Sequence, residues 1–460
     1  MKKIKRMVAL FLCIAMAATM LACGNADTQT EEANVGESTT TKATEQEKET
    51  EKETEEVTET ETIPYVQEPI TIEFWYTLSG DNEIALQEII SEFNATNEYG
   101  ITVNGSFQGN YAKNLSKVVA AYGTGTEPTI ALLASGGFET LEDAGALADM
   151  SAYVARDNWD LENIPEDLRY YMQFREGKIL EFPYLVSTAT IFYNKALMTE
   201  EPTSLEEWVS TAKDITAKNP GTAGMYLTLD AGFIQRPIIK SLSGDDFTSK
   251  DGNSAACIDD GSMLKFMTDW KEWIDGGYCM NIQTTDAKNK MLNAFATGEL
   301  ASFAYSSSNI NTIKKFADEN NIDLGVCKMV GYGGYAAPLG GGGLVVLDSK
   351  SQQEQAAAWE FLKFLYEDSN VVKIHKVTGY MPFTRSSWED AEIKAFWSEN
   401  PEFAVAAEQM EWGTYNGWSL YLAEWRTQIT NCMTSVLSDA SMTPEEMIDY
   451  LRTQISVIFP

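Results

Sequence analysis

The chain offers few side chains for covalent catalysis. Its single histidine, His375, lies in sequence typical of the end of a helix, and a serine or cysteine hydrolase would have to use that imidazole as its base. Nothing around His375 favours such a role, so the pattern indicates a structural histidine, at a helix end or at the surface. We therefore predict no catalytic residue, no enzyme activity and no cofactor.

The cysteines do not form a recognisable metal site. Those outside the N-terminal region are Cys257, Cys279, Cys327 and Cys432. No C-x-x-C pair occurs and no histidine lies near any of them in the sequence, which argues against zinc. A disulfide between Cys257 and Cys279 would suit an oxidising location outside the cell, but the spacing leaves the pairing open. We predict no metal site.

Two pairs of adjacent carboxylates are candidates for acid–base catalysis. A glycosidase needs two positioned carboxyl groups, one on each side of the scissile bond, and Asp245-Asp246 or Asp259-Asp260 could supply them. Both pairs lie in polar, glycine-bearing sequence typical of solvated turns. The segment Asp251-Gly252-Asn253 likewise lacks the alternating acidic ligands of a calcium loop. A secreted glycosidase stays an alternative, and binding without turnover is favoured.

Aromatic, hydroxyl and glycine residues point to non-covalent recognition instead. A sugar or polyol needs flat apolar surfaces for its C–H faces and directional partners for its hydroxyls. Aromatic side chains in loop-like sequence or at a strand end are Trp75, Tyr76, Trp412 and Trp418. Tryptophans on helical stripes, which we expect in the core, are Trp208, Trp270, Trp273 and Trp359. The glycine run 340–343 could bring backbone N–H groups close to a ligand or form a hinge, and both interpretations stay open.

Alternating strands and helices must position these residues. Residues 70–75 and 101–103 alternate as strands, and apolar residues within 86–93 and 115–122 repeat at helical spacing. A third apolar strand covers 129–133, so the βαβαβ order predicts a parallel sheet with crossover helices.

Later elements continue the pattern. Ser204 and Thr443 begin capping boxes, residues 344–347 are a buried-strand candidate, and 352–366 is a helix. The fold class is α/β throughout, and ligands of such sheets bind at loops beyond the carboxyl ends of the strands.

The N-terminal region predicts export and tethering. A basic start leads into an apolar stretch that ends before Cys23, which is typical of a signal peptide over 1–22. Met20-Leu21-Ala22-Cys23-Gly24 resembles the lipobox of bacterial lipoproteins, and the alternative is a plain secretory signal with an incidental cysteine. Residues 23–69 comprise the lipidated cysteine and a Glu/Thr-rich segment that we expect to be a disordered tether. Such anchoring is typical of Gram-positive cells, at the extracellular face of the cytoplasmic membrane.

The net charge limits the partners. The formal charge is −34 at pH 7, and both the tether and the body are acidic. An acidic surface argues against nucleic acid and against lying on anionic lipid, so we expect membrane contact through the lipid anchor only. It does not forbid an anionic ligand, since one buried arginine could capture it.

The order of short motifs resembles that of family 1 extracellular solute-binding proteins over nearly all of residues 70–455. Glycerol-3-phosphate binders look closest and maltose binders more distant. The motifs are Phe74-Trp75-Tyr76 with Asn82, Phe93-Asn94, Gly109-Asn110-Tyr111, Gly123-Thr124-Gly125, Glu127-Pro128, Phe192-Tyr193-Asn194-Lys195 with Pro202 and Trp208, Gly298-Glu299-Leu300-Ala301, Tyr305-Ser306-Ser307-Ser308, Gly340-Gly341-Gly342-Gly343 and Thr378-Gly379-Tyr380-Met381-Pro382.

The resemblance implies a two-lobed, type II periplasmic-binding-protein-like fold that encloses its ligand between the lobes. Chain crossings fall near 183–186, 337–341 and 381–384, so both lobes are discontinuous. The N-terminal lobe is then 70–185 plus 342–381, and the C-terminal lobe is 186–341 plus 382–460. The implied function is that of a monomeric ABC importer component, which delivers a sugar or polyol to permease subunits. A sensory receptor or an adhesin would share the fold.

Carried over residue by residue, the family's ligand positions fall on hydroxyl, glycine and aromatic residues. Those that match in type are Tyr111, Ser187, Ser307, Gly341, Tyr380 and, as an aromatic, Phe233. Two positions differ in residue type from the family. Ser135 stands where the family has an acidic ligand residue, and Trp418 stands near the position of an arginine of the closest subfamily. The loss of that cation weakens a phosphate interpretation, although Arg426 could substitute for it.

Overall fold

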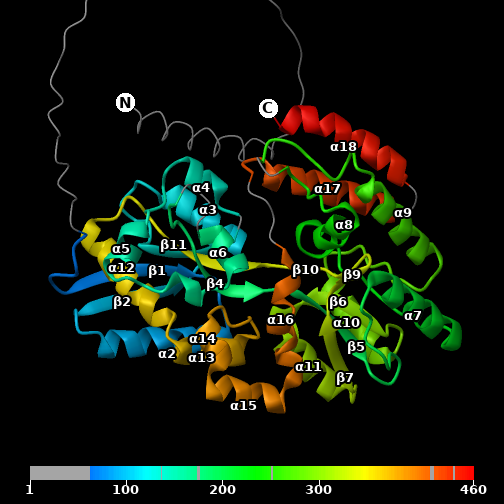
Figure 1. Cartoon of the computed structure of the whole chain (residues 1–460), viewed down its shortest axis with the longest axis horizontal. Coiled ribbons are helices and arrows are strands. Elements are labelled where there is room, and N and C mark those ends of the chain that lie inside the picture. The colour runs from blue at the N-terminus through cyan, green and yellow to red at the C-terminus, as the bar shows by residue number, and fades with distance from the viewer. Residues whose placement is uncertain are drawn as a thin grey trace, which may run out of the picture. The chain divides into compact units, whose positions relative to one another are not determined.

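The computed structural model describes residues 63–459, apart from Gly136 and residues 173–176, 250–251, 415–418 and 439–440. The predicted signal peptide, Cys23, all but the last residues of the tether, and Trp418 lie outside the described residues. Pro64–Pro460 form one compact unit. Within it, strands and helices alternate along most of the chain (Figure 1), which confirms the α/β class.

The first sheet is mixed, with strand order β2-β1-β3-β11-β4. Its strands are β1 (Ile70–Tyr76), β2 (Ile101–Phe107), β3 (Ile130–Ala134), β4 (Phe182–Ser187) and β11 (Gly340–Val346). β1 is parallel to β2 and β3, as the βαβαβ order predicts, but β11 is antiparallel to both β3 and β4. The prediction of a parallel sheet was wrong for that half, because β11 follows the short strand β10 directly, without a crossover helix that would return it in the parallel direction.

Helices cover both faces of the first sheet. Phe74 faces α2 (Asp81–Thr96) and α12 (Gln352–Leu365), where its ring lies 5.8 Å from that of Phe361. Its neighbour Trp75 points to the other face and packs with Val118 of α3 (Tyr111–Ala121). This alternation is the period of two that the sequence shows. Helix α13 (Asp368–Thr378) packs beside α2.

The second sheet has the order β6-β5-β7 and is antiparallel. Its strands are β5 (Ala189–Asn194), β6 (Ser302–Ser306) and β7 (Leu324–Lys328), and the longer helices around it are α7 (Leu205–Lys218), α8 (Arg236–Ser243), α9 (Ser262–Asp275), α10 (Ala287–Thr297), α11 (Ile310–Glu319), α17 (Leu422–Leu437) and α18 (Pro444–Ile458). Trp208, Trp270 and Trp273 lie in its core, and Trp359 lies in that of the first sheet, each at most 6% exposed. All four core predictions are confirmed.

The chain connects the first sheet to the elements around the second sheet at two adjacent points. Thr188 joins β4 to β5, and Leu339 joins β10 (Ala337–Pro338) to β11. Near them, Met381 pairs with Val186. The chain thus forms two α/β lobes, each around its own sheet (Figure 1). The residue limits of the lobes stay predictions.

One buried side chain holds the crossing region together. Gln409 is 1% exposed, and its Nε2 donates to Thr188 Oγ1 and to the Ala189 carbonyl oxygen, both at 2.7 Å. Its Oε1 accepts from the Met329 amide at 2.9 Å. The amide is fully hydrogen-bonded, as burial of a polar group requires.

The predicted helix starts are present. The Thr443 side chain and Glu446 form a reciprocal capping box, and the Ser204 side chain accepts from the Glu207 amide. Glu207 itself bonds to the Thr203 amide rather than to that of Ser204. The remaining elements are α4 (Glu139–Asp143), α5 (Ser151–Arg156), α6 (Glu166–Met172), α14 (Arg385–Glu389), α15 (Ala391–Glu399), α16 (Val405–Glu408), η2 (Leu161–Asn163), η3 (Ala231–Gln235), η4 (Ser307–Asn309), η5 (Pro401–Phe403), η6 (Met410–Trp412), β8 (Val330–Gly331), β9 (Gly334–Tyr335) and β12 (Gly413–Thr414).

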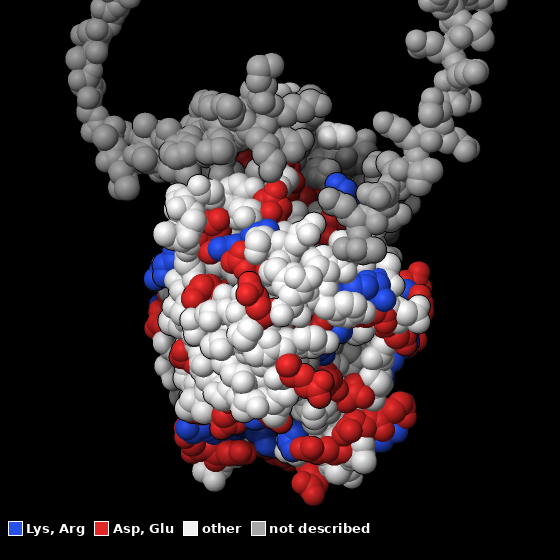
Figure 2. All heavy atoms as spheres, turned by 90° about the vertical axis from the view of Figure 1, so that its left-hand side faces the viewer, with Lys and Arg blue, Asp and Glu red and all other residues white. Residues whose placement is uncertain are grey.

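The surface and the thiols agree with the charge and cysteine patterns. Carboxylates and basic groups are interspersed on the face shown in Figure 2. Within the described residues, every helix is too short or too polar to span a bilayer.

Cys257, Cys279, Cys327 and Cys432 are free and buried, and burial raises the pKa of all four thiols. The structure therefore settles the open question of disulfides among them: none is formed.

Candidate functional site

The glycine run lies where the first sheet meets the second lobe, and each glycine makes room for a neighbour. Gly341 has φ +118°, and a Cβ there would overlap the Leu185 carbonyl oxygen. A Cβ on Gly342 would meet the Tyr111 ring and hydroxyl, and one on Gly340 would meet the Phe233 ring. The run therefore brings aromatic side chains from both lobes against one bare strand.

Tyr111 and Tyr380 come together at this strand. Tyr111 begins α3, Tyr380 follows α13, and both side chains are half-buried. Burial raises the pKa of both hydroxyls, and the proximity of Tyr380 adds to the rise for Tyr111. The Tyr111 hydroxyl is buried and forms no well-aligned hydrogen bond among the described residues. Such an orphaned polar atom is expected where a ligand or water completes a site.

His375 fixes the backbone of Tyr380. Trp397 Nε1 donates to His375 Nε2 at 2.9 Å, so Nδ1 carries the proton and donates to the Tyr380 carbonyl oxygen at 2.7 Å. The imidazole is 1% exposed, and burial lowers its pKa to about 4. The structural interpretation of His375 is confirmed. The surface placement was wrong, because aromatic rings cover the end of α13.

The two predicted serines occupy the crossing itself. Ser307 Oγ accepts from the Thr188 amide at 3.2 Å, and the Ser307 amide donates to the Thr188 carbonyl oxygen at 2.7 Å. Ser187 is 5% exposed and pairs with Gly340 across the sheet. Both serines therefore have structural roles at the crossing, and their contact with a solute stays a prediction.

Phe233 projects from a short π-helix, η3. The Asp230 carbonyl oxygen accepts from the Gln235 amide, and the Ala231 carbonyl oxygen accepts from the Arg236 amide. Each of these bonds spans five residues, which winds the segment more widely than an α-helix. Segments of this kind are often found at functional sites. The winding directs the half-buried Phe233 ring towards Gly340 of the first sheet.

Arg426 of α17 lies between charged groups of both lobes. A Cβ on Gly232 would overlap its guanidinium group, so the arginine lies flat on η3. Burial raises the pKa of Glu139 on α4 and the pKa of Asp230, and the charge of Arg426 opposes both rises. The sequence singles out Arg426 but not its two acidic neighbours, because the three residues come from distant segments.

Ser135 directly follows β3 and contacts a residue that the sequence analysis missed. Its hydroxyl lies 2.6 Å from Oε1 of Glu181, which is 0% exposed. Burial raises the pKa of Glu181 to about 8, nearby Glu139 and Glu142 add to the rise, and the bond to Ser135 opposes it.

The comparisons decide the family. Residues 88–405 match the profile described as bacterial extracellular solute-binding protein. The chain belongs to this family.

Individual relatives agree with that membership. The sn-glycerol-3-phosphate-binding periplasmic protein UgpB of Escherichia coli K12 is 26% identical over 364 residues, 75% of this chain and 81% of the relative. Two solved structures share the fold with a TM-score of 0.73 each. The cyclic alpha-maltosyl-1,6-maltose binding protein of Arthrobacter globiformis is 19% identical, covering 85% of this chain and 99% of the other. UgpB of Mycobacterium tuberculosis, in complex with glycerophosphocholine, is 20% identical, covering 85% and 98%.

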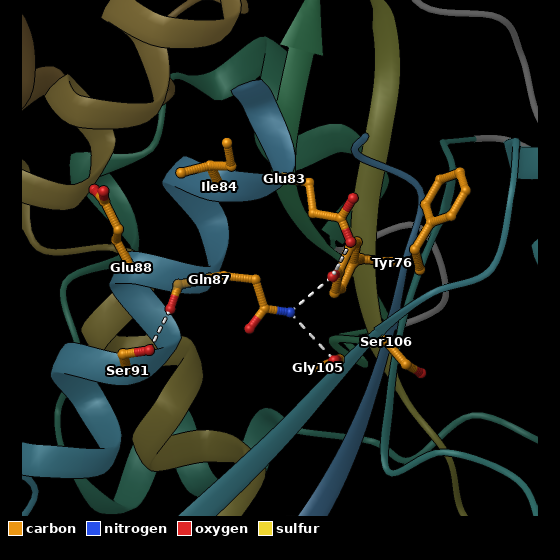
Figure 3. Close-up of a pocket in the computed structure, with 9 residues that line it drawn as sticks. Tyr76, Glu83, Ile84, Gln87, Glu88, Ser91, Gly105 and Ser106 are labelled. Carbon is orange, nitrogen blue, oxygen red and sulfur yellow. Dashed lines mark hydrogen bonds between the residues drawn. The ribbon is translucent and has the colours of Figure 1, made fainter. Parts of the chain in front are cut away.

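Three predicted ligand positions of this solute-binding protein lie elsewhere or are not described. Tyr76 is 1% exposed and lines a groove between α2 and β2, where its hydroxyl donates to Glu83 and accepts from Gln87 (Figure 3). Trp412 packs its ring 4.7 Å from that of Tyr335, and Trp418 lies outside the described residues. Their roles in binding stay predictions.

The described residues contain no group of three or more His, Cys, Asp or Glu side chains that could hold a metal ion. The family consists of solute-binding proteins, which act by binding.

Proposed function

We propose that this protein captures an extracellular carbohydrate, a mono- or oligosaccharide, in a cleft between its lobes and passes it unaltered to the permease of an ABC importer. The observation that supports this most is the convergence of Tyr111, Tyr380 and Phe233 on the bare strand at Gly340–Gly342. Aromatic faces and hydroxyls from both lobes suit the C–H and O–H surfaces of a sugar.

A second observation supports an enclosed cleft. Asp230 is exposed to water, yet the protein around it raises its pKa. A side chain that water reaches but protein surrounds is typical of a binding cleft. The fold neighbour from Arthrobacter globiformis is a maltosyl-maltose binder, so a carbohydrate also fits the comparisons.

A second solute class is favoured by Arg426. The sequence weakens a phosphate interpretation, because Trp418 stands near the position of a family arginine and that cation is lost. Arg426, however, lies between Glu139 and Asp230, and guanidinium is the best partner for a phosphate. Two of the relatives are glycerol-3-phosphate or glycerophosphocholine binders by name or complex. Glycerol-3-phosphate or a glycerophosphodiester is therefore the alternative ligand.

A ligand screen separates these candidates. Tryptophan emission and thermal unfolding of residues 64–460 would be followed with mono-, di- and oligosaccharides, glycerol-3-phosphate and glycerophosphocholine. A response to a sugar alone supports the first proposal, and one to the phosphates alone supports the second. If no compound gives a response, both are contradicted. Chromatography of the same sugars after incubation tests the glycosidase alternative, which requires a product.

Trp418 has its own test. We expect Trp418→Ala to weaken sugar binding more than tenfold, with a nearly unchanged melting temperature, because a stacked indole adds affinity without holding the core. The buried Trp208 is no control for this variant, since its removal would open a cavity. Trp388 of α14, which is partly exposed and is not a candidate ligand residue, is the matched choice. Unaltered affinity in Trp418→Ala removes the residue from the site.

We further propose that the protein is a monomeric lipoprotein, exported by a signal peptide over 1–22. Cys23 carries the lipid, 23–69 is the tether, and the body stands at the extracellular face of a Gram-positive cytoplasmic membrane. The apolar stretch before Cys23 and the acidic tether support this. Cys23→Ala should release the protein into the medium and abolish labelling by a fatty-acid analogue. Retention on the membrane would contradict the anchor.

A further inference from the structure

A carboxyl group lies buried directly behind a predicted ligand residue. Glu181, just before β4, is 0% exposed, and its Oε1 lies 2.6 Å from Ser135 Oγ at the end of β3. A Cβ on Gly343 would overlap the carboxyl group, so the glycine of β11 makes room for it. Ser135 itself is half-buried, within reach of water. The pair therefore links a buried acid to a hydroxyl at the surface of the first lobe.

The surroundings of Glu181 disfavour a negative charge. The titratable groups that face it are Glu139 and Glu142 of α4, Tyr111 of α3 and Tyr366 after α12. No lysine or arginine of the described chain forms an ion pair with Glu181. Arg426 acts on Glu139 instead. The second carboxyl oxygen of Glu181, Oε2, is buried without a hydrogen-bond partner among the described residues. A neutral carboxyl group tolerates this better than an ionised one.

We propose that Glu181 is a positioning residue for solute binding, which sets whether the Ser135 hydroxyl donates a hydrogen bond to the solute or only accepts one. The inference rests on the proposed function and adds a residue to its site. Only one hydrogen fits between the two oxygens at 2.6 Å. When Glu181 is protonated, its O–H donates to Ser135 Oγ, and the Ser135 proton is free to point at a solute. When Glu181 is ionised, the Ser135 O–H donates to the carboxylate instead, as a charge-assisted hydrogen bond.

This exchange makes solute affinity depend on pH in a definite direction. Burial raises the pKa of Glu181 to about 8, so the carboxyl group is mostly neutral at neutral pH and ionises above that value. Ionisation removes one donor from the site. We therefore expect affinity for an uncharged sugar to fall as pH rises through about 8, by about five- to tenfold, the effect of one hydrogen bond.

The test compares residues 64–460 of the wild-type protein with the same residues carrying Glu181→Gln or Ser135→Ala. Calorimetry with maltotriose, an uncharged probe, gives the dissociation constant between about pH 6 and about pH 9.5. The glutamine amide can donate to Ser135 at every pH, so Glu181→Gln should keep the affinity that the wild type has at low pH, with no alkaline decline. Ser135→Ala lacks the hydroxyl group whose hydrogen bond changes. Its affinity for maltotriose should be weaker than that of the wild type at low pH and should not change with pH.

A second readout separates the inference from the proposed function. Thermal unfolding of the wild type and of Glu181→Gln, without solute, reports the ionisation of Glu181 by itself. Wild-type affinity that stays constant across the range overturns the inference, as does a decline that Glu181→Gln retains. Absence of saturable maltotriose binding at every pH instead counts against the proposed oligosaccharide function, and the inference falls with it. A declining affinity in the wild type that both variants lack supports the proposal.

Discussion

Arg426 is held in place by shape and by charge at once. The absent side chain of Gly232 lets its guanidinium lie against η3, and Glu139 and Asp230 attract it from the two lobes. No described carboxylate forms an ion pair with it, so its hydrogen-bond donors are not consumed by a direct salt bridge. A cation kept in that way suits an anionic guest.

The first prediction concerns this cation. Arg426→Ala should weaken binding of glycerol-3-phosphate more than tenfold, because a phosphate would lose the guanidinium group that lies between Asp230 and Glu139. Binding of a neutral sugar should change far less. Isothermal calorimetry with both ligands measures the contrast. Arg452→Ala is the matched control, since Arg452 is half exposed and contacts Asp259 and Asp449 at the surface of α18. Equal losses for both ligands would contradict a role in recognising charge.

The second prediction concerns His375. Its pKa is lowered to about 4 by burial, whereas the unfolded chain takes up the proton near the ordinary value of about 6.5. Stability should therefore decline as pH falls from about 6.5 to about 4, by roughly 3 kcal/mol, and then level off. His375→Gln should lack this decline. Thermal unfolding of both proteins across that range is the measurement, and parallel curves would contradict the assignment.

At the scale of elements, β11 combines two tasks in one strand. Its second half, Leu344–Val346, is buried between β3 and β4, while its first half is bare glycine. The side chains that fill the space come from other elements: Tyr111 from α3, Phe233 from η3 and Glu181 from before β4. The strand therefore supplies backbone, and its neighbours supply the chemistry.

The third prediction tests that arrangement. Gly341→Ala should destabilise the protein by at least about 2 kcal/mol, because φ +118° strains an alanine and the new Cβ overlaps the Leu185 carbonyl oxygen. Gly334→Ala is the matched control, since Gly334 has ordinary φ and nothing within 4 Å of the new methyl group. Chemical denaturation gives both free energies of unfolding. Similar values for the two variants would show that the glycine run has no strict conformational role.

Sequence reasoning succeeded where the signal is local. The period-two strand at Phe74 and Trp75, the capping box at Thr443 and the buried stripe around Trp208 all follow from neighbours in the chain. It failed for β11, whose direction depends on a distant entry point. It also missed Glu181, which lies beside Ser135 only because β3, β11 and β4 are adjacent. Spacing along one chain carries no information about such pairs.

At the scale of the molecule, two sheets joined by short crossings allow one lobe to turn against the other. The connections at Thr188 and Leu339 are single residues between strands, so little backbone has to move. Hinges of this kind absorb a rotation over a few positions.

The fourth prediction follows from those crossings. We expect the lobes to be open without solute and to close on it, so small-angle X-ray scattering should show a smaller radius of gyration when the right ligand is added. Glycerol, which is too small to touch both lobes, serves as the control. An unchanged scattering curve at saturating ligand would contradict closure.

Gln409 anchors the backbone at one of these crossings. Its amide forms hydrogen bonds with Thr188, Ala189 and Met329. If the lobes turn about this crossing, each atom moves in proportion to its distance from it. The outer rims of the two lobes are then displaced most, and the residues around Gln409 are displaced least. A transporter that contacts the outer rims of the lobes would thus meet a large displacement, although the solute itself is bound near the crossing, where displacements are small. The Met329 amide should exchange its hydrogen slowly whether the guest is present or absent.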